Sequence, residues 1–113
     1  METDLHTRQC TPCEGGTQPL EPETARERLQ ALDSEWSLDG EGRGLSRTLR
    51  FKDFHHTMAF VNAVAWIAHR QDHHPDLEVG YNTCRVHFST HAIGGLSDND
   101  FICAARVDRL LQD

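Results

Sequence analysis

The feature that constrains the fold most is a long helical pattern in the middle of the chain. A proline follows this pattern, and the helix must end before it. The apolar residues recur at intervals of three and four and fall on one arc at about 100° per residue. They are Phe54, Met58, Val61, Ala65 and Ala68, with Phe60, Val64 and Ile67 widening the arc. Asp53 is a suitable N-cap, and Pro75 disfavours helical geometry at His74. The sequence therefore predicts a helix that begins at Phe54, reaches at least Ala68 and ends by about His74.

Strand patterns flank this helix on both sides. Between residues 35 and 52, apolar residues alternate before and after a glycine-rich turn, which is typical of a β-hairpin. Residues 77–81 and 84–89 are predicted to form a second pair of strands, joined by a tight turn at "YNT". In the last of these strands, alternate side chains are expected to face the core.

Two further helices are predicted, one near each end of the chain. Pro22 suits the first position of a helix that reaches about Leu32. Ser97 and Asp100 match a capping-box pattern, which places Asp100 in the first turn of a last helix that runs to about Leu111. The predicted order is α-β-β-α-β-β-α. Because strands that come in hairpins favour an antiparallel sheet, the expected fold class is α+β.

Length, charge and hydropathy predict a small soluble protein. The 113 residues suffice for one core, and residues 1–18 lack periodicity, so we expect a mobile N-terminal arm (1–18) and a single domain (19–113). The formal net charge of −7 and the absence of a Lys/Arg run argue against direct binding to nucleic acid. No apolar run approaches the roughly 20 residues of a membrane span, and no signal-peptide order is present, so a cytoplasmic location is expected.

The four cysteines divide into two groups. Cys84 falls in a strand pattern and Cys103 in a helix pattern, and both are expected to be buried thiols. Cys10 and Cys13 form "CTPC", which is half of a zinc-ribbon spacing. Because no second half follows at the usual interval, a mobile arm is favoured over a folded zinc module.

The stretch "AHRQDHHPDLEVGYN" holds three histidines and leaves three interpretations open. His69 and His73 are four residues apart, a spacing that zinc sites use, but the glutamate of H-E-x-x-H is missing and the helix must end near His74. Adjacent imidazoles can instead exchange protons near neutral pH, since the unperturbed pKa of histidine is about 6.5. The third interpretation is a solvent-exposed helix end. His91 is a further candidate, because it precedes a Gly-Gly loop where side chains tend to face open clefts.

Together the motifs "DHHPDLEVGYN" and "VHFSTHAIGGLSDNDF" closely resemble the pterin-4a-carbinolamine dehydratases, also known as dimerisation cofactors of a homeodomain transcription factor. The resemblance covers roughly residues 18–112, and "CTPCEGG" resembles the lead-in of bacterial members. It implies a four-stranded antiparallel sheet with three helices packed on one face. It also implies a dehydratase that converts 4a-hydroxytetrahydrobiopterin to quinonoid dihydropterin and water, in tetrahydropterin recycling, without a metal or redox cofactor.

The resemblance also assigns residues to the site. It implies that three histidines carry out the acid–base steps, namely His73, His74 and His91. It implies that three further residues surround the pterin or shape its site, namely His69, Pro75 and Asp100. His69 stands where many members carry a glutamate, which changes the local charge.

The expected partners are a pterin substrate and an aromatic amino acid hydroxylase that supplies it. A four-stranded sheet leaves two edges that can pair with a second copy, so a homodimer or homotetramer is predicted. Two other functions stay open. One is a non-catalytic protein-binding or assembly factor of the same fold, which the retained histidines disfavour. The other is a metal-binding protein that uses His69, His73 and Cys10 or Cys13.

Overall fold

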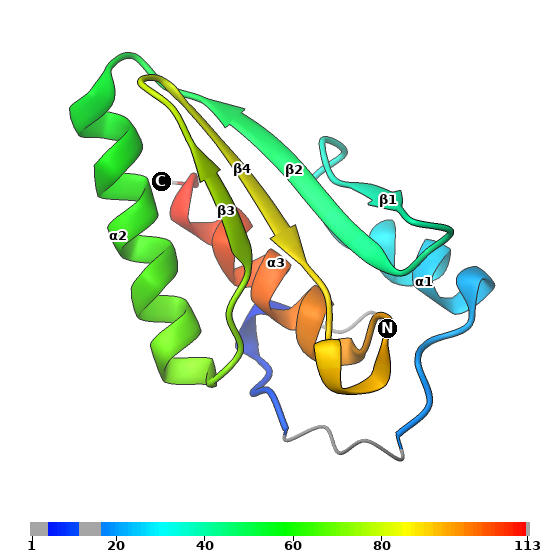
Figure 1. The fold of residues 1–113 in the computed structure, drawn as a ribbon. Coiled ribbons are helices and arrows are strands. Elements are labelled where there is room, and N and C mark those ends of the chain that lie inside the picture. The colour runs from blue at the N-terminus through cyan, green and yellow to red at the C-terminus, as the bar shows by residue number, and fades with distance from the viewer. Residues whose placement is uncertain (1–4, 12–16, 113) are drawn as a thin grey trace.

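The computed structural model describes residues 5–11 and 17–112, and Figure 1 shows their arrangement. Three helices and one four-stranded antiparallel sheet follow the predicted order α-β-β-α-β-β-α, which confirms the α+β class. The helices are α1 (Pro22–Leu29), α2 (Phe54–Gln71) and α3 (Asp98–Leu110). The strands are β1 (Ser37–Asp39), β2 (Gly44–Arg50), β3 (Asp76–Val79) and β4 (Thr83–Phe88), and two short 3-10 turns are η1 (Leu5–Thr7) and η2 (His91–Ile93).

Helix α2 begins and ends where its sequence signals predict. The Asp53 side chain accepts a hydrogen bond of 2.9 Å from the backbone N–H of His56, which confirms the N-cap. At the other end, Asp72 adopts a left-handed conformation with φ of 53°, and the helix ends at Gln71. The chain thus leaves the helical path before His73, so the shared helical face that a metal site at His69 and His73 requires is absent.

Helix α1 is shorter than predicted. The helix ends at Leu29 rather than Leu32. The reason is a change of hydrogen-bond pattern, since Ala31 and Leu32 donate to the carbonyl groups three residues earlier at 3.0 Å. Ala25 in α1 is fully buried, so this short helix still covers part of the core.

The sheet has the strand order β1-β2-β4-β3. Both predicted strands of the second hairpin are present, although each begins and ends one or two residues earlier than expected. In β4 the predicted alternation is confirmed, because Cys84, Val86 and Phe88 are buried while the residues between them are not. The register pairs Leu45 with Phe88 across β2 and β4, which brings two large core side chains together.

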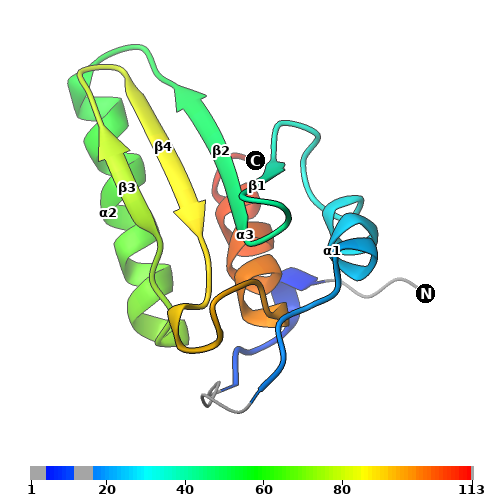
Figure 2. The same cartoon turned by 45° about the vertical axis from the view of Figure 1, so that its right-hand side comes forward.

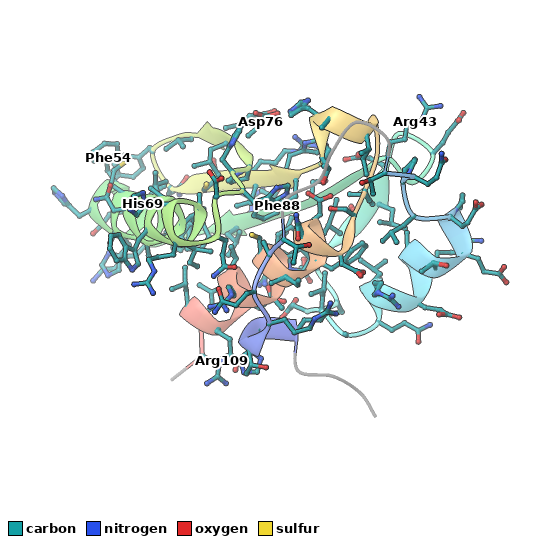
Figure 3. All side chains as sticks on the ribbon, turned by 90° about the horizontal axis from the view of Figure 1, so that it is seen from below. Arg43, Phe54, His69, Asp76, Phe88 and Arg109 are labelled. Atoms are coloured by element: carbon teal, nitrogen blue, oxygen red, sulfur yellow. The ribbon has the colours of Figure 1, made fainter. Side chains whose placement is uncertain are left out.

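All three helices lie on one side of the sheet, as Figure 3 shows. Phe88, labelled there, points between the sheet and α3, whereas Asp76 lies on the opposite face of the sheet. Leu96, Phe101 and Ile102 from the start of α3 pack into the same core and are almost fully buried. The core therefore lies between the sheet and the layer of helices.

Residues 5–11 pack beside α3, where Figures 1 and 2 show them in dark blue. Leu5 is buried, and the Arg106 guanidinium donates to the carbonyl of Arg8 at 2.6 Å. The predicted mobility of the whole arm, residues 1–18, stays a prediction. Cys84 and Cys103 are buried as predicted, and Cys13 lies outside the described residues.

No helix in the described part of the chain has both the length and the apolar character needed to cross a membrane.

Candidate active site

A cavity of about 520 Å³ opens where the end of α2, the loop after β4 and residues 10 and 11 meet. Its volume lies in the range typical of small-molecule sites. All three predicted catalytic histidines line this cavity, namely His73, His74 and His91. The other lining residues are Cys10, Thr11, Arg70, Gln71, Asp72, Ser89, Thr90, Ala92 and Asn99.

The antiparallel hairpin of β3 and β4 brings the histidines together. Its register pairs Asp76, at the start of β3, with His87, near the end of β4. The residues that precede β3 and those that follow β4 must therefore lie at the same end of the hairpin. This places the pair His73 and His74 at the same end of the hairpin as His91, although 16 residues lie between His74 and His91.

His73 is held firmly by its neighbours. Its Nε2 lies 2.6 Å from Oδ1 of Asp100, and its ring stacks on Phe88 with a centroid distance of 6.0 Å. The side chain of His73 is 12% exposed, and that of Asp100 is fully buried. The other carboxylate oxygen accepts hydrogen bonds from the Thr90 hydroxyl at 2.8 Å and from the backbone N–H of Ser97 at 2.9 Å. The bond to Ser97 is the one the predicted capping box requires, so the carboxylate caps α3 and orients His73 at the same time.

The surroundings of His73 favour its protonated form. Burial alone lowers the pKa of His73, because a charged imidazolium loses solvation. The hydrogen bond and negative charge of Asp100 act in the opposite direction, with smaller contributions from Cys10 and Asp72. The balance raises the pKa of His73 above its ordinary value, so this ring is suited to donate a proton or to carry positive charge.

His74 and His91 differ from His73 in being exposed. Among the residues that the structure describes, none forms a hydrogen bond with either imidazole ring. Both rings border the cavity, so their nitrogens can donate to or accept from a bound molecule. The site thus combines one fixed imidazole with two that a ligand can engage directly.

The three residues predicted to bind substrate occupy different places. Asp100 lies behind His73 and does not line the cavity. Pro75 is half-buried and follows the histidine pair, also outside the lining set. His69, labelled in Figure 3, stays on an exposed part of α2, with its ring 5.4 Å from that of Trp66. The structure therefore does not bring His69 to the other histidines, and its predicted role stays a prediction.

Several residues that line the cavity were not predicted from the sequence. Thr90 could have been found, because the alternation of β4 continues past Phe88 and points Thr90 inward, where it is buried. Cys10 and Thr11 gave no signal of this kind, since their segment has no periodicity. Their position depends on hydrogen bonds with side chains more than sixty residues away: the backbone N–H of Cys10 donates to Gln71, and the backbone of Thr11 bonds to Asn99.

Metal-ligand geometry is not found in the described part of the chain, where no cluster of three or more His, Cys, Asp or Glu side chains could hold an ion.

The fold and the site define a class of protein: an α+β protein with a cavity lined by histidines that can transfer protons. Residues 18–110 match the family described as pterin 4 alpha carbinolamine dehydratase. A protein of Nitrosomonas eutropha, named as a candidate pterin-4-alpha-carbinolamine dehydratase, is 60% identical over 108 residues, which cover 96% of this chain and 94% of that protein. The chain therefore belongs to the pterin 4 alpha carbinolamine dehydratase family.

Two solved structures share the fold. The transcriptional coactivator/pterin dehydratase from Brucella melitensis matches with a TM-score of 0.77 and 29% identity, over 82% of this chain and 98% of that chain. A pterin dehydratase-like protein identified as a RuBisCO assembly factor in the alpha-carboxysome matches with a TM-score of 0.61 and 24% identity, over 70% of this chain and 92% of that chain. The second likeness concerns the fold alone.

Proposed function

We propose that this protein is a hydro-lyase that converts 4a-hydroxytetrahydropterin to quinonoid dihydropterin and water. Membership of the family over residues 18–110 supports the reaction class. The observation that carries the proposal is the convergence of His73, His74 and His91 on one cavity of about 520 Å³, with the first of them held by a buried carboxylate. A cavity of this volume can enclose a bicyclic heterocycle.

The reaction needs two proton transfers. The 4a-hydroxyl oxygen accepts a proton and leaves as water when the C4a–O bond breaks. N5 loses its proton to a base, and its electrons form the double bond between C4a and N5. Because one proton is delivered and one is removed, the reaction is redox-neutral, and imidazole side chains can serve both steps near neutral pH.

The geometry suggests how the roles are divided. His73 is assigned as the proton donor, because Asp100 raises the pKa of His73 and favours the imidazolium form that carries the proton. His74 then serves as the base at N5, and His91 holds the leaving hydroxyl. Asp100 is a positioning residue, since its carboxylate contacts His73 and not the cavity.

Replacement of each histidine by alanine tests this proposal. Turnover of enzymatically generated 4a-carbinolamine, followed by its ultraviolet absorbance, should fall by about 10²-fold or more in the His73→Ala and His74→Ala variants. His55→Ala is the matched control, because His55 is exposed on α2 far from the cavity and should leave turnover unchanged. Thermal unfolding of the same preparations separates inactive variants from misfolded ones. Near-full activity in well-folded His73 and His74 variants would refute the acid–base assignment and favour a binding protein of the same fold.

A further inference from the structure

Two cysteines from distant parts of the chain meet in the wall of the cavity. The sulfur of Cys10 lies 3.6 Å from the sulfur of Cys103, although 93 residues separate them. Cys10 lines the cavity and is partly exposed, whereas Cys103 is buried in α3 behind it. Neither the proposed reaction nor the packing of the core requires two thiols at this point.

The surrounding structure holds the two sulfurs against each other. Gln71 accepts a hydrogen bond of 2.9 Å from the backbone N–H of Cys10, and Asn99 binds the backbone of Thr11 through two bonds of 3.0 and 2.6 Å. These contacts anchor the residues around Cys10 to α2 and α3. Cys103 is fixed by its helix, and its sulfur also lies 3.8 Å from the carbonyl oxygen of His73. The approach of the sulfurs is therefore a product of tertiary structure.

The two thiols have different acidities. The hydrogen bond from Cys103 lowers the pKa of Cys10, and the positive charges of His73 and Arg106 lower it further against the effect of burial. The same hydrogen bond, together with burial, raises the pKa of Cys103. Cys10 is thus the thiol that ionises and reacts, while Cys103 stays protonated beside it.

We propose that Cys10 and Cys103 are a peroxide-reactive thiol pair that closes to a disulfide in the wall of the cavity. The Cys10 thiolate attacks hydrogen peroxide, whose O–O bond breaks, giving a sulfenic acid on Cys10 and hydroxide, and the hydroxide takes up the proton that Cys10 released and becomes water. The Cys103 sulfur then attacks the Cys10 sulfur, the S–S bond forms, and the hydroxyl leaves with the Cys103 proton as water. In sum, two thiols lose two electrons to one peroxide, which becomes two water molecules.

Closure needs a small movement. The sulfurs must approach by about 1.5 Å to go from 3.6 Å to the bonding distance of a disulfide. Cys10 can supply this movement, because it lies in irregular chain outside the helices and strands, whereas Cys103 is held inside α3. The product would tie residues 5–11 covalently to α3.

Cys84 provides an internal control. It is fully buried beneath the sheet, and burial raises the pKa of Cys84. It does not line the cavity, so peroxide should leave it reduced while Cys10 reacts. The proposal does not depend on the dehydratase reaction, and Cys10 lies outside the residues 18–110 that match the family.

The test is peptide mapping of the reduced full-length protein after treatment with hydrogen peroxide and alkylation of the remaining thiols. We expect a peptide that links Cys10 to Cys103, a mass loss of about 2 Da for the bond, reversal by dithiothreitol, and a thermal unfolding midpoint raised by at least about 5 °C while the bond is present. Cys10→Ser should abolish both the disulfide-linked peptide and the rise in the thermal unfolding midpoint. Cys13→Ser should retain both, which separates this bond from one inside "CTPC".

Three outcomes would overturn the proposal. They are a bond between Cys10 and Cys13, oxidation of Cys10 beyond the sulfenic acid without participation of Cys103, and disulfides only between protein molecules. Because Cys10 is partly exposed, Cys10→Ser should fold normally, so a missing link in this variant reports chemistry rather than misfolding.

Discussion

Replacement of Asp100 by asparagine isolates the charge that holds His73. Asparagine is nearly isosteric, and its amide oxygen can still accept from Thr90 and from the backbone N–H of Ser97, which lie 2.8 and 2.9 Å from the carboxylate. Its NH₂ group then faces His73 in place of the oxygen that lies 2.6 Å from Nε2. The bond to a charged partner is lost, which costs about 1.5–3 kcal/mol in the free energy of unfolding for so buried a pair.

The raised pKa of His73 sets the sign of the pH dependence. A group whose pKa is higher in the folded than in the unfolded chain stabilises the fold fully below the unfolded pKa of about 6.5, and this contribution is lost as the pH rises through the folded pKa. In Asp100→Asn the charge of Asp100 is lost, so burial, which lowers the pKa of His73, is opposed only by the smaller effects of Cys10 and Asp72. The destabilisation should therefore be about 1.5–3 kcal/mol near about pH 5.5 and clearly smaller near about pH 9.

Urea unfolding at both pH values, followed by tryptophan fluorescence, to which the buried Trp36 contributes, measures this effect. Asp98→Asn is the matched control, because Asp98 lies in the same first turn of α3 but pairs with Arg28 at the surface. Its replacement should cost less than about 1 kcal/mol at either pH. A destabilisation by Asp100→Asn that is equal at both pH values, or larger at high pH, would refute the idea that Asp100 stabilises the protonated imidazole. In turnover assays, the loss of activity at high pH should move to lower pH in Asp100→Asn if His73 is the acid.

Three further predictions concern the same structure. Thr90→Val keeps the shape of a buried side chain but removes the hydroxyl that contacts Asp100 and Ser97. The free energy of unfolding in urea should therefore fall by about 1–2 kcal/mol. An unchanged unfolding midpoint would contradict this prediction. Strands β1 and β3 form the edges of the sheet, so sedimentation at micromolar concentration should show a homodimer or larger species; a single 12.8 kDa species would contradict it. Catalysis should survive prolonged chelation, because imidazoles suffice for both proton transfers, and loss of activity that zinc restores would show otherwise.

Local signals explain why much of the fold was predictable. The N-cap Asp53, the helix-ending Pro75 and the capping box of Ser97 and Asp100 each act within a few residues of chain, so sequence proximity carries the information. The same holds for the alternation in β4. Helix α1 was less predictable, because the switch from helical to 3-10 hydrogen bonds at residues 30–32 leaves no clear mark in the residues themselves.

Ion pairs between distant residues could not be predicted from local sequence patterns. Arg47 lies on the same face of β2 as Leu45 and Leu49, a position that period-two alternation assigns to the core. Its guanidinium lies 2.8 Å from Asp108 in α3, a partner 61 residues away. Nothing in the sequence around Arg47 identifies that partner, yet an unpaired charge at this position would be strongly destabilising. Contacts between distant segments such as these can be identified only from the structure.

The cavity depends both on local signals and on contacts between distant segments. His73, His74 and His91 stand beside helix and strand boundaries that local signals predict, so their meeting follows from an antiparallel hairpin. The remaining wall comes from Cys10 and Thr11, whose positions rest on contacts with Gln71 and Asn99 rather than on any periodic pattern. This wall can therefore change without disturbing the regular elements that position the three histidines. The irregular N-terminal segment therefore supplies the part of the wall that holds Cys10, one member of the proposed thiol pair.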